Sequence, residues 1–301
     1  MRKFLCWWIL VVCACVLVGG LVMRELPDGR LHVYALDVGQ GDSMLLRLPH
    51  GGSVLIDGGP GSNVVEPLRR AIGWMARDID LVVVTHFDRD HCEGLLSVLE
   101  DYHVVRVMIT GVEQRTELQG RLFALIREKG IPVWIADANS DVVLDRGFGD
   151  GLSDEIVMDV LSPFESLAGK YFKNANETSI VTRILVGDPR AMRSEIFTTG
   201  DIGFETEKKL VARYGNILRA EILKVAHHGS RYSSGEDFLS RVRATWAVIS
   251  VGAKNTYHHP HPDALSRLLK MTDLSHILRT DQRGTVETII NSSGKIMSVG
   301  L

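Results

Sequence analysis

The chain of 301 residues has four cysteines, and three of them, at positions 6, 13 and 15, fall within its first 22 residues. Only Cys92 belongs to the remainder, so internal disulfides cannot stabilise that part of the chain, and core packing or a bound metal has to do so. An excess of positive charge is also lacking, since the formal net charge is −3. The chain is therefore not a general polycation, and any affinity for nucleic acid has to come from a local patch or a metal site.

Low-complexity tracts, short-period repeats and a second long apolar run are missing too. Charged residues at 24% and aromatic residues at 7% exclude a collagenous or disordered chain. The only charges in residues 1–22 are Arg2 and Lys3, so the remaining 279 residues carry a formal charge of −5. That length is enough for one large domain with a sizeable core.

The one long apolar run lies at the N-terminus. Phe4–Val22 holds 19 residues without a charged side chain, directly after Arg2 and Lys3. A helix needs about 20 apolar residues to cross a bilayer, and positive residues before the run favour a cytoplasmic N-terminus with the rest outside. We therefore expect residues 1–22 to be a membrane anchor and residues 30–301 to be a domain outside the cytoplasmic membrane.

A cleaved signal peptide is the alternative for residues 1–22. Small residues at Val18-Gly19-Gly20 offer a cleavage point, and Val12-Cys13-Ala14-Cys15 has a weak lipoprotein-like pattern. In every case the domain is expected to be membrane-anchored or exported.

Turn-forming Gly and Pro residues divide the body into strand-like and helical stretches. We expect strands at residues 31–38, 43–49, 53–57, 80–85, 104–110, 131–136, 156–161, 179–186, 195–199, 221–226, 246–251, 276–280, 284–290 and 295–299. We expect helices at residues 63–76, 94–102, 116–130, 204–215, 235–242 and 262–271, and an irregular stretch at 137–153. Strand-rich segments that lead twice into strand–helix alternation favour two sheets packed face to face with helices outside.

Seven of the 11 histidines fall in three short stretches, at residues 86–91, 227–228 and 258–261. The first stretch follows an apolar run and reads His86-Phe87-Asp88-Arg89-Asp90-His91, so four potential metal ligands occupy six positions. A loop at the carboxyl end of a buried strand is where α/β sheets usually place active sites. His86 and Asp88 alternate in an extended segment and could share one ion, while Asp90 and His91 could hold a second. Nitrogen and oxygen donors together favour zinc or manganese.

Two further segments could complete a two-metal site. Asp201 ends the run Thr198-Thr199-Gly200-Asp201 and could bridge two ions, and His227 and His228 follow another strand-like run. Each segment alone is a weak signal, because Gly-Asp is a common turn and histidine pairs often lie in a core or on a surface. Together with the 86–91 loop they predict a dinuclear site.

These motifs, in this order, resemble the metallo-β-lactamase superfamily. Its marks are Asp57-Gly58-Gly59 after a strand, His86-x-Asp88-x-Asp90-His91, and Thr199-Gly200-Asp201. Four further segments resemble the metallo-β-lactamase domain of the ComEC competence proteins: LDVGQGDS at 36–43, Asn176-x-x-Ser179, LKVAHHGS at 223–230, and SVGAKNTYHHPHP at 250–262. The resemblance extends over residues 31–290 and implies an α/β fold, the four-layer αββα sandwich, with a two-metal hydrolytic site. The long channel region of those proteins has no counterpart in this sequence.

The resemblance also implies a role for each site residue. His86 and Asp88 would hold one ion, Asp90, His91 and His228 would hold the other, and Asp201 would bridge the two. Asp57 would orient ligands, Asn176 and Ser179 would line the pocket, and His259 and His261 would contact substrate or complete a coordination shell. The usual second histidine of the β-lactamases is Asp88 here, which argues against antibiotic hydrolysis.

Charge favours a phosphate ester as the substrate. Two divalent ions set against Asp88, Asp90 and Asp201 leave one net positive charge, which matches one phosphodiester. Two ions about 3.5–4 Å apart can activate water and stabilise the departing oxygen. The candidate catalytic residues are Asp90 and His227, the latter as a proton donor to the leaving group, although His227 could also be a plain hydrogen-bonded neighbour.

The resemblance therefore implies a metal-dependent phosphodiesterase or nuclease that acts on DNA in a competence-related role. One alternative is an esterase for a small or polymer-linked phosphodiester such as phosphocholine, which the charge of −5 makes credible. The other is a non-catalytic, metal-stabilised module in DNA uptake. The candidate basic residues around the pocket are Arg231, Lys254, Arg279 and Arg283.

Overall fold

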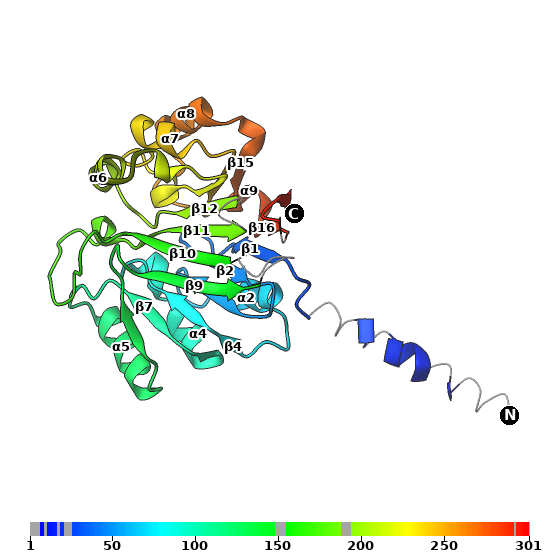
Figure 1. Ribbon diagram of the computed structural model, residues 1–301. Coiled ribbons are helices and arrows are strands. Elements are labelled where there is room, and N and C mark those ends of the chain that lie inside the picture. The colour runs from blue at the N-terminus through cyan, green and yellow to red at the C-terminus, as the bar shows by residue number, and fades with distance from the viewer. Residues whose placement is uncertain are drawn as a thin grey trace.

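The computed structural model describes residues 7–8, 11–16, 19–20, 26–147, 155–187, 194–291 and 293–300. Two β-sheets pack face to face, and helices cover the outer face of each (Figure 1). This arrangement is the expected four-layer αββα sandwich.

In the described part of the chain the first sheet has eight strands, in the order β17-β16-β1-β2-β3-β5-β7-β8. They are β1 (Leu31–Ala35), β2 (Met44–Arg47), β3 (Ser53–Ile56), β5 (Leu81–Val83), β7 (Val107–Ile109), β8 (Val133–Ile135), β16 (Val286–Ile290) and β17 (Ile296–Val299). Strands β1, β2 and β3 pair antiparallel, whereas β3, β5, β7 and β8 pair parallel. The carboxyl ends of the parallel strands therefore meet at one edge of the sheet. The short strands β4 (Asp78–Ile79) and β6 (His103–Val104) form a separate pair.

The second sheet repeats this plan, with seven described strands in the order β15-β14-β13-β12-β11-β10-β9. They are β9 (Asp141–Arg146), β10 (Glu155–Ser162), β11 (Val181–Gly187), β12 (Ser194–Thr198), β13 (Ile222–Lys224), β14 (Trp246–Ile249) and β15 (Ile277–Arg279). Strands β9 to β12 pair antiparallel and β12 to β15 pair parallel. After β15 the chain returns through the short helix α9 (Thr280–Arg283), and β16 pairs antiparallel with β1 of the first sheet. The two sheets therefore belong to one folding unit.

Three apolar layers hold the sandwich together. The central layer lies between the sheets and includes Val33, Ile56, Met158 and Ile196. The first outer layer packs helices α2 (Val65–Ile72), α4 (Leu95–Asp101) and α5 (Glu117–Glu128) on the first sheet, and the second packs α6 (Phe204–Tyr214), α7 (Glu236–Val242) and α8 (Pro262–Met271) on the second. Each fully buried aliphatic or aromatic side chain contributes roughly 1.5–3 kcal/mol, so these layers can stabilise the domain without disulfides.

Local sequence explains where the helices start. Helix α5 begins after Thr116, whose side chain accepts a hydrogen bond from the backbone N–H of Gln119 at 3.2 Å. Helix α8 begins at Pro262, a residue suited to the first helical position because its missing N–H would have no partner there. Its cap is His261, whose Nδ1 accepts from the backbone N–H of Asp263 at 3.1 Å.

Most expected elements are present, with ends one to a few residues shorter than the sequence suggested. The expectation of an irregular stretch at 137–153 is wrong for residues 141–146, which form the edge strand β9. Residues 148–153 of that stretch lie outside the described residues. A further helix that was not expected, α3 (Arg89–Cys92), follows β5 and carries two candidate ligands.

The N-terminal segment is helical at residues 7–8, 11–16 and 19–20, and these residues lie apart from the sandwich (Figure 1). The expected apolar span Phe4–Val22 falls partly outside the described residues. Within the residues that the structure describes, no helix is both long and apolar enough to span a membrane.

Candidate metal centre

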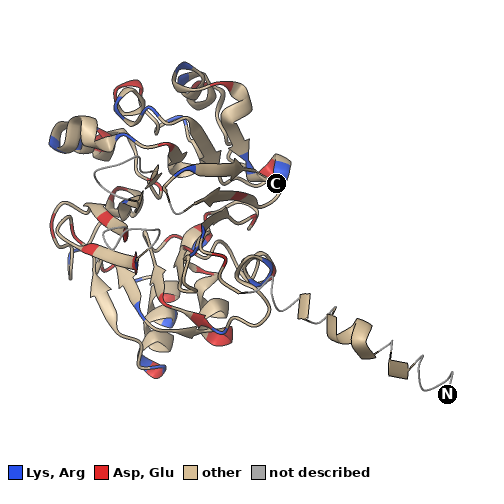
Figure 2. Cartoon of the chain, turned by 45° about the vertical axis from the view of Figure 1, so that its right-hand side comes forward, with Lys and Arg blue, Asp and Glu red and all other residues tan. Residues whose placement is uncertain are grey.

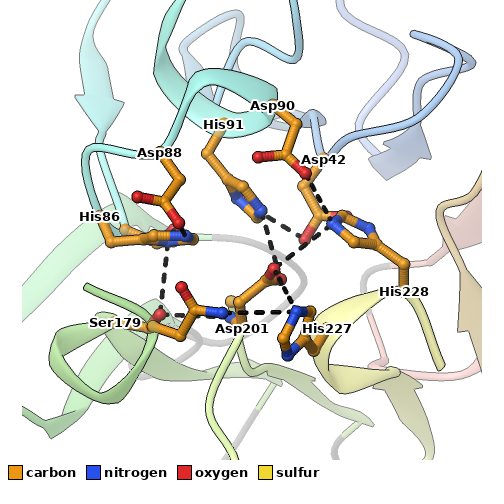
Figure 3. Close-up of polar contacts among 12 residues, drawn as sticks. Asp42, His86, Asp88, Asp90, His91, Ser179, Asp201, His227 and His228 are labelled. Carbon is orange, nitrogen blue, oxygen red and sulfur yellow. Dashed lines mark hydrogen bonds and ion pairs between the residues drawn. The ribbon is translucent and has the colours of Figure 1, made fainter. Parts of the chain in front are cut away.

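The candidate ligands come from both sheets. His86 and Asp88 follow β5, and Asp90 and His91 lie on α3. From the second sheet, Asp201 follows β12, and His228 lies on the 3-10 helix η3 (Ala226–Gly229) after β13. Because all of these segments follow the carboxyl ends of parallel strands, the side chains converge at one edge between the sheets (Figure 3).

Four ligands surround one point. The ligand atoms of Asp90, His91, Asp201 and His228 all lie within 4.8 Å of one another. His91 Nε2 is 3.2 Å from Asp201 Oδ1, and His228 Nε2 is 3.3 Å from Asp90 Oδ2 and 3.4 Å from Asp201 Oδ2. Asp201 thus faces both histidines, as a shared ligand would.

The donor atoms of this cluster fit a divalent cation. The Nε2 atoms of His86, His91 and His228 and the Oδ1 atom of Asp201 are buried and have no hydrogen-bond partner among the described residues. A buried polar atom without a partner costs about 1–3 kcal/mol, so the unpartnered atoms of His91, Asp201 and His228 within one cluster indicate that a further group belongs there. Nitrogen and carboxylate donors are suited to zinc and manganese.

His86 and Asp88 lie beside this cluster. His86 Nε2 is 3.8 Å from Asp88 Oδ2, and the ring of His86 lies 4.1 Å from that of His91, centroid to centroid. The Asp88 side chain is 44% exposed and that of Asp90 is 32% exposed. The centre is therefore closed on the side of the histidines and open to solvent on the side of these two carboxylates.

Polar contacts behind the rings orient the three histidines. Asp57 Oδ2 lies 2.7 Å from His91 Nδ1, and the carbonyl oxygen of Ser250 lies 2.9 Å from His228 Nδ1. Thr85 Oγ1 is 3.0 Å from His86 Nδ1, and the same hydroxyl donates to Asp57 Oδ2 at 2.6 Å. Because each Nδ1 has a partner, each Nε2 is directed to the cluster. Asp57 lies where a residue that orients ligands would have to be.

Left-handed backbone occurs at residues of this centre. Asp57 has a φ of 61°, His227 of 51° and His228 of 53°. Residues other than glycine rarely adopt this region, and doing so costs on the order of 1–3 kcal/mol. The surrounding sheets impose these conformations on the loops that carry the side chains.

The remaining expected residues differ in their distance from the cluster. His227 Nε2 lies 3.8 Å from Asp201 Oδ2 and 3.4 Å from Asn176 Nδ2, which is placed to donate to it. Ser179 Oγ lies 3.4 Å from His86 Nδ1 and accepts from the backbone N–H of Asp201 at 3.2 Å. Burial lowers the pKa of His227, so its ring is mainly neutral at pH 7.

His259 and His261 lie in different surroundings. The ring of His259 is 5.8 Å from that of His227 and 6.4 Å from that of His228. Burial, together with the neighbouring His228, lowers the pKa of His259 to about 4, so this ring is neutral at pH 7. The side chain of His261 instead caps helix α8, and its described hydrogen bonds and ion pairs do not reach the cluster.

A buried ion pair that was not expected from the sequence lies directly behind the cluster. Asp42, in the loop before β2, pairs with Lys224 at the end of β13, and both side chains are buried. Asp42 Oδ1 is also 3.1 Å from His228 Nδ1, and Asp42 Oδ2 is 3.9 Å from His91 Nδ1. The Asp42 carboxylate thus lies behind two candidate ligands. The backbone N–H of Asp42 donates to the carbonyl of Asp90 at 3.0 Å. Asp42 lies in the segment LDVGQGDS and Lys224 in LKVAHHGS. A charged residue within each of these segments was the sequence signal for the pair.

These charges set the protonation of the cluster. Burial opposes a charge on His91, but the carboxylates of Asp201 and Asp57 outweigh it and raise the pKa of His91 well above its usual value. Burial likewise opposes a charge on His228, but the carboxylates of Asp201 and Asp42 outweigh it and raise the pKa of His228 well above its usual value. In contrast, burial lowers the pKa of His86 to about 3, and the neighbouring His91 adds to this effect.

Known proteins share this fold. Residues 36–164 match the family model of the metallo-beta-lactamase superfamily. Long-form RNase Z from yeast shares the fold, with a TM-score of 0.50 and 11% sequence identity over 88% of this chain and 42% of that one. The chain carries a metallo-β-lactamase domain, the domain of a metallo-hydrolase superfamily.

Curated relatives define the kind of metallo-β-lactamase domain. The chain is 31% identical over 273 residues to ComE operon protein 3 of Bacillus subtilis (strain 168), which covers 84% of this chain and 32% of that protein. It is 27% identical over 276 residues to competence protein ComA of Neisseria gonorrhoeae, which covers 90% of this chain and 34% of that protein. The domain is ComEC-like, and the chain spans about a third of the length of these relatives.

Binding of zinc or manganese to the metal-free protein is expected to release protons at pH 7. The raised pKa values keep His91 and His228 protonated, and each ring must lose the proton at Nε2 before it can bind a metal. The apparent affinity should therefore rise with pH below these raised pKa values. Calorimetric titration in buffers of different ionisation enthalpy measures the protons released, and equal heats in all buffers would contradict the expectation. His50→Gln, a change at an exposed histidine beside Asp145, should release as many protons as the wild type.

Asp42 and Lys224 are expected to depend strongly on each other. Asp42→Asn or Lys224→Met should each lower the free energy of unfolding by about 3–5 kcal/mol, because each leaves one buried charge without its partner, and the double variant should lose less than the sum. Denaturant unfolding of the four proteins measures this. The exposed pair Lys270–Glu236, at 2.6 Å, is the matched control, and its coupling should be much weaker because solvent screens both charges. If the double variant loses as much free energy of unfolding as the two single variants together, Asp42 and Lys224 do not couple the two sheets.

Proposed function

We propose that this domain is a metal-dependent phosphodiesterase that cleaves DNA in a competence-related role. The observation that carries the proposal is the cluster of Asp90, His91, Asp201 and His228, whose unpartnered Nε2 and carboxylate atoms face one point beside His86 and Asp88. Two divalent ions there would leave about one net positive charge opposite an incoming phosphodiester. The similarity to competence proteins supports DNA as the substrate.

The open side of the centre defines how a substrate would approach. Bound divalent ions would supply Lewis acidity, which lowers the pKa of water and offsets negative charge on the phosphate. Asp88 and Asp90 border the solvent, so the scissile group would arrive on their side. His227 is partly exposed, and its Nε2 lies 3.8 Å from Asp201 Oδ2, so a proton taken up at this nitrogen would be stabilised by the carboxylate before transfer to a leaving oxygen. In the neutral ring the same Nε2 is placed to accept from Asn176 Nδ2.

The distribution of charge favours a second candidate substrate, a small or polymer-linked phosphodiester. Basic and acidic residues are interspersed over the helices of both outer layers (Figure 2). Among the candidate basic residues, Arg279 is engaged by both carboxylate oxygens of Asp281, at 2.9 and 2.6 Å, and Arg231 lies 3.4 Å from Asp263. A nuclease that follows a long strand uses a continuous basic groove, so these pairs favour recognition of a short segment around the scissile bond.

We further propose that residues 1–22 hold the domain at the outer side of the cytoplasmic membrane. Trp7, Trp8, Val12 and Val16 are exposed in the described part of this segment, as apolar side chains in contact with lipid would be. The full chain should sediment with bacterial membranes and should stay in the membrane fraction after a wash with alkaline carbonate. Protease added to spheroplasts should digest the domain. A domain that stays protected from protease, or a full chain released by carbonate, would contradict this placement.

The wild-type protein with manganese or zinc is expected to hydrolyse DNA, and Asp90→Ala should lower the rate at least about 100-fold because it removes a ligand from the open side of the centre. Gel assays with labelled strands measure the rate, and elemental analysis measures the metal bound to each variant. Asp101→Ala, a change at an exposed carboxylate at the end of α4, is the control and should keep wild-type activity. Glycerophosphocholine tests the second candidate substrate. No hydrolysis of DNA by the wild type, or equal rates for Asp90→Ala, would refute the nuclease proposal.

A further inference from the structure

Three aromatic rings form a ladder that leads from the metal centre to the solvent. The ring of His228, a candidate ligand, is stacked with that of His259, with centroids 6.4 Å apart and planes 29° apart. His259 is in turn stacked with Tyr257, at 5.8 Å and 24°. Successive ring planes are inclined by less than 30°, and Tyr257 is the outermost ring.

Tyr257 is highly exposed but lies on a tightly held turn. Its exposed fraction is 65%, so most of the ring beyond the contact with His259 is open to solvent. Asn255 closes the turn on both sides: its Nδ2 donates to the carbonyls of Gly252 and His259, and its Oδ1 accepts from the N–H of His259, all at 2.8 Å. A large exposed aromatic ring on such a turn is already oriented before any partner arrives, which lowers the entropic cost of binding.

The same turn also carries a cation. Lys254 lies in the same turn, is exposed, and has no acidic partner among the residues that the structure describes. An exposed aromatic ring and an ammonium group on one turn match a nucleotide, whose base has two flat faces and whose phosphate is an anion. Proteins that bind single strands combine these two features.

We propose that Tyr257 is a stacking platform for an unpaired base of a single-stranded DNA whose phosphodiester lies at the metal centre. This inference rests on the proposed function and deepens it. The ladder places the platform next to the centre, so the stacked base would belong to a nucleotide close to the scissile phosphate. Bases within a duplex are already stacked on both faces, so the platform selects for a strand that is unpaired at this point. Every base has a π-face, so the contact is tolerant of sequence.

The experiment pairs a change in the protein with a change in the ligand. Binding of the metal-loaded protein is measured by fluorescence anisotropy with two labelled phosphorothioate strands of equal length, one with bases and one with abasic sites throughout. Both strands carry the same charge, so the electrostatic part of binding is matched, and the change in preference between protein variants reports the contacts to bases. The wild type is expected to bind the strand with bases about tenfold more tightly, and Tyr257→Ala should abolish most of this preference.

Two further variants separate stacking from indirect effects. Tyr257→Phe keeps the ring and should keep the preference for bases. Trp74→Ala removes an aromatic side chain of similar exposure, 57%, that follows α2 at the opposite edge of the first sheet from the metal centre, and it should also keep the preference. Elemental analysis confirms that all variants carry the same metal.

The outcomes distinguish this inference from the proposed function. A wild-type preference for bases that Tyr257→Ala removes and Tyr257→Phe retains supports the platform, whether or not cleavable strands are hydrolysed. If the wild type and Tyr257→Ala prefer the strand with bases to the same degree, the platform is overturned. It is also overturned if Tyr257→Phe loses this preference as fully as Tyr257→Ala does. Absence of phosphodiester hydrolysis by the wild type refutes the proposed function alone.

Discussion

The structure depends on a group of charges that cannot remain buried without mutual support. The carboxylates of Asp42, Asp57 and Asp201 and the imidazoles of His91 and His228 lie in the apolar space between two sheets. An isolated charge there would cost several kcal/mol, so each group has to face an opposite charge or a hydrogen-bond partner. Lys224 supplies one of the opposite charges. The unpartnered Nε2 atoms of the histidines leave room for a bound cation, so the same cluster constrains folding and is the candidate metal site.

The topology of the sandwich delivers this cluster. Each sheet has a parallel half, and the loops at the carboxyl ends of β5, β12 and β13 come together at one edge. Near the C-terminus, β16 pairs with β1 and so connects the second half of the chain to the first sheet. Close packing refines the arrangement, because a side chain at Gly41 would collide with the carbonyl oxygen of Asp90. The positions of the ligands are thus set by three apolar layers whose residues have no chemical role.

Rigid positioning is a common property of the site and its surroundings. Asp57, His227 and His228 keep left-handed backbone conformations that an isolated loop would avoid. Such strained and well-packed ligands lose little freedom when a metal or substrate binds, so preorganisation lowers the cost of binding. The turn that carries Tyr257 has the same character, since Asn255 closes it with three hydrogen bonds. The metal centre and the neighbouring aromatic ladder therefore form one preformed surface.

The fold and the candidate ligands could be predicted from the sequence through local signals and through the resemblance to the metallo-β-lactamase superfamily. Strand–helix alternation indicated two sheets with outer helices, and the density of His and Asp after the strand at 81–83 indicated the metal loop. Strand β9 could not be recognised in this way, because an edge strand with charged residues among its apolar ones, in a Gly- and Asp-rich stretch, has little apolar pattern. Helix α3 has four residues, too few for a helical period to appear.

By itself, the sequence determined the elements of this protein, the class of its fold and the side chains able to bind a metal, since these follow from periodicity and from donor chemistry along short stretches. Only the tertiary structure decided which groups face one another. Asp42 and Lys224 are 182 positions apart, and no local pattern records their contact. In the same way, the structure made His261 a helix cap and stacked Tyr257 on His259, which in turn stacks on His228. Packing of the two sheets alone brings such groups together, because a contact between distant segments depends on the whole core and not on the residues next to it.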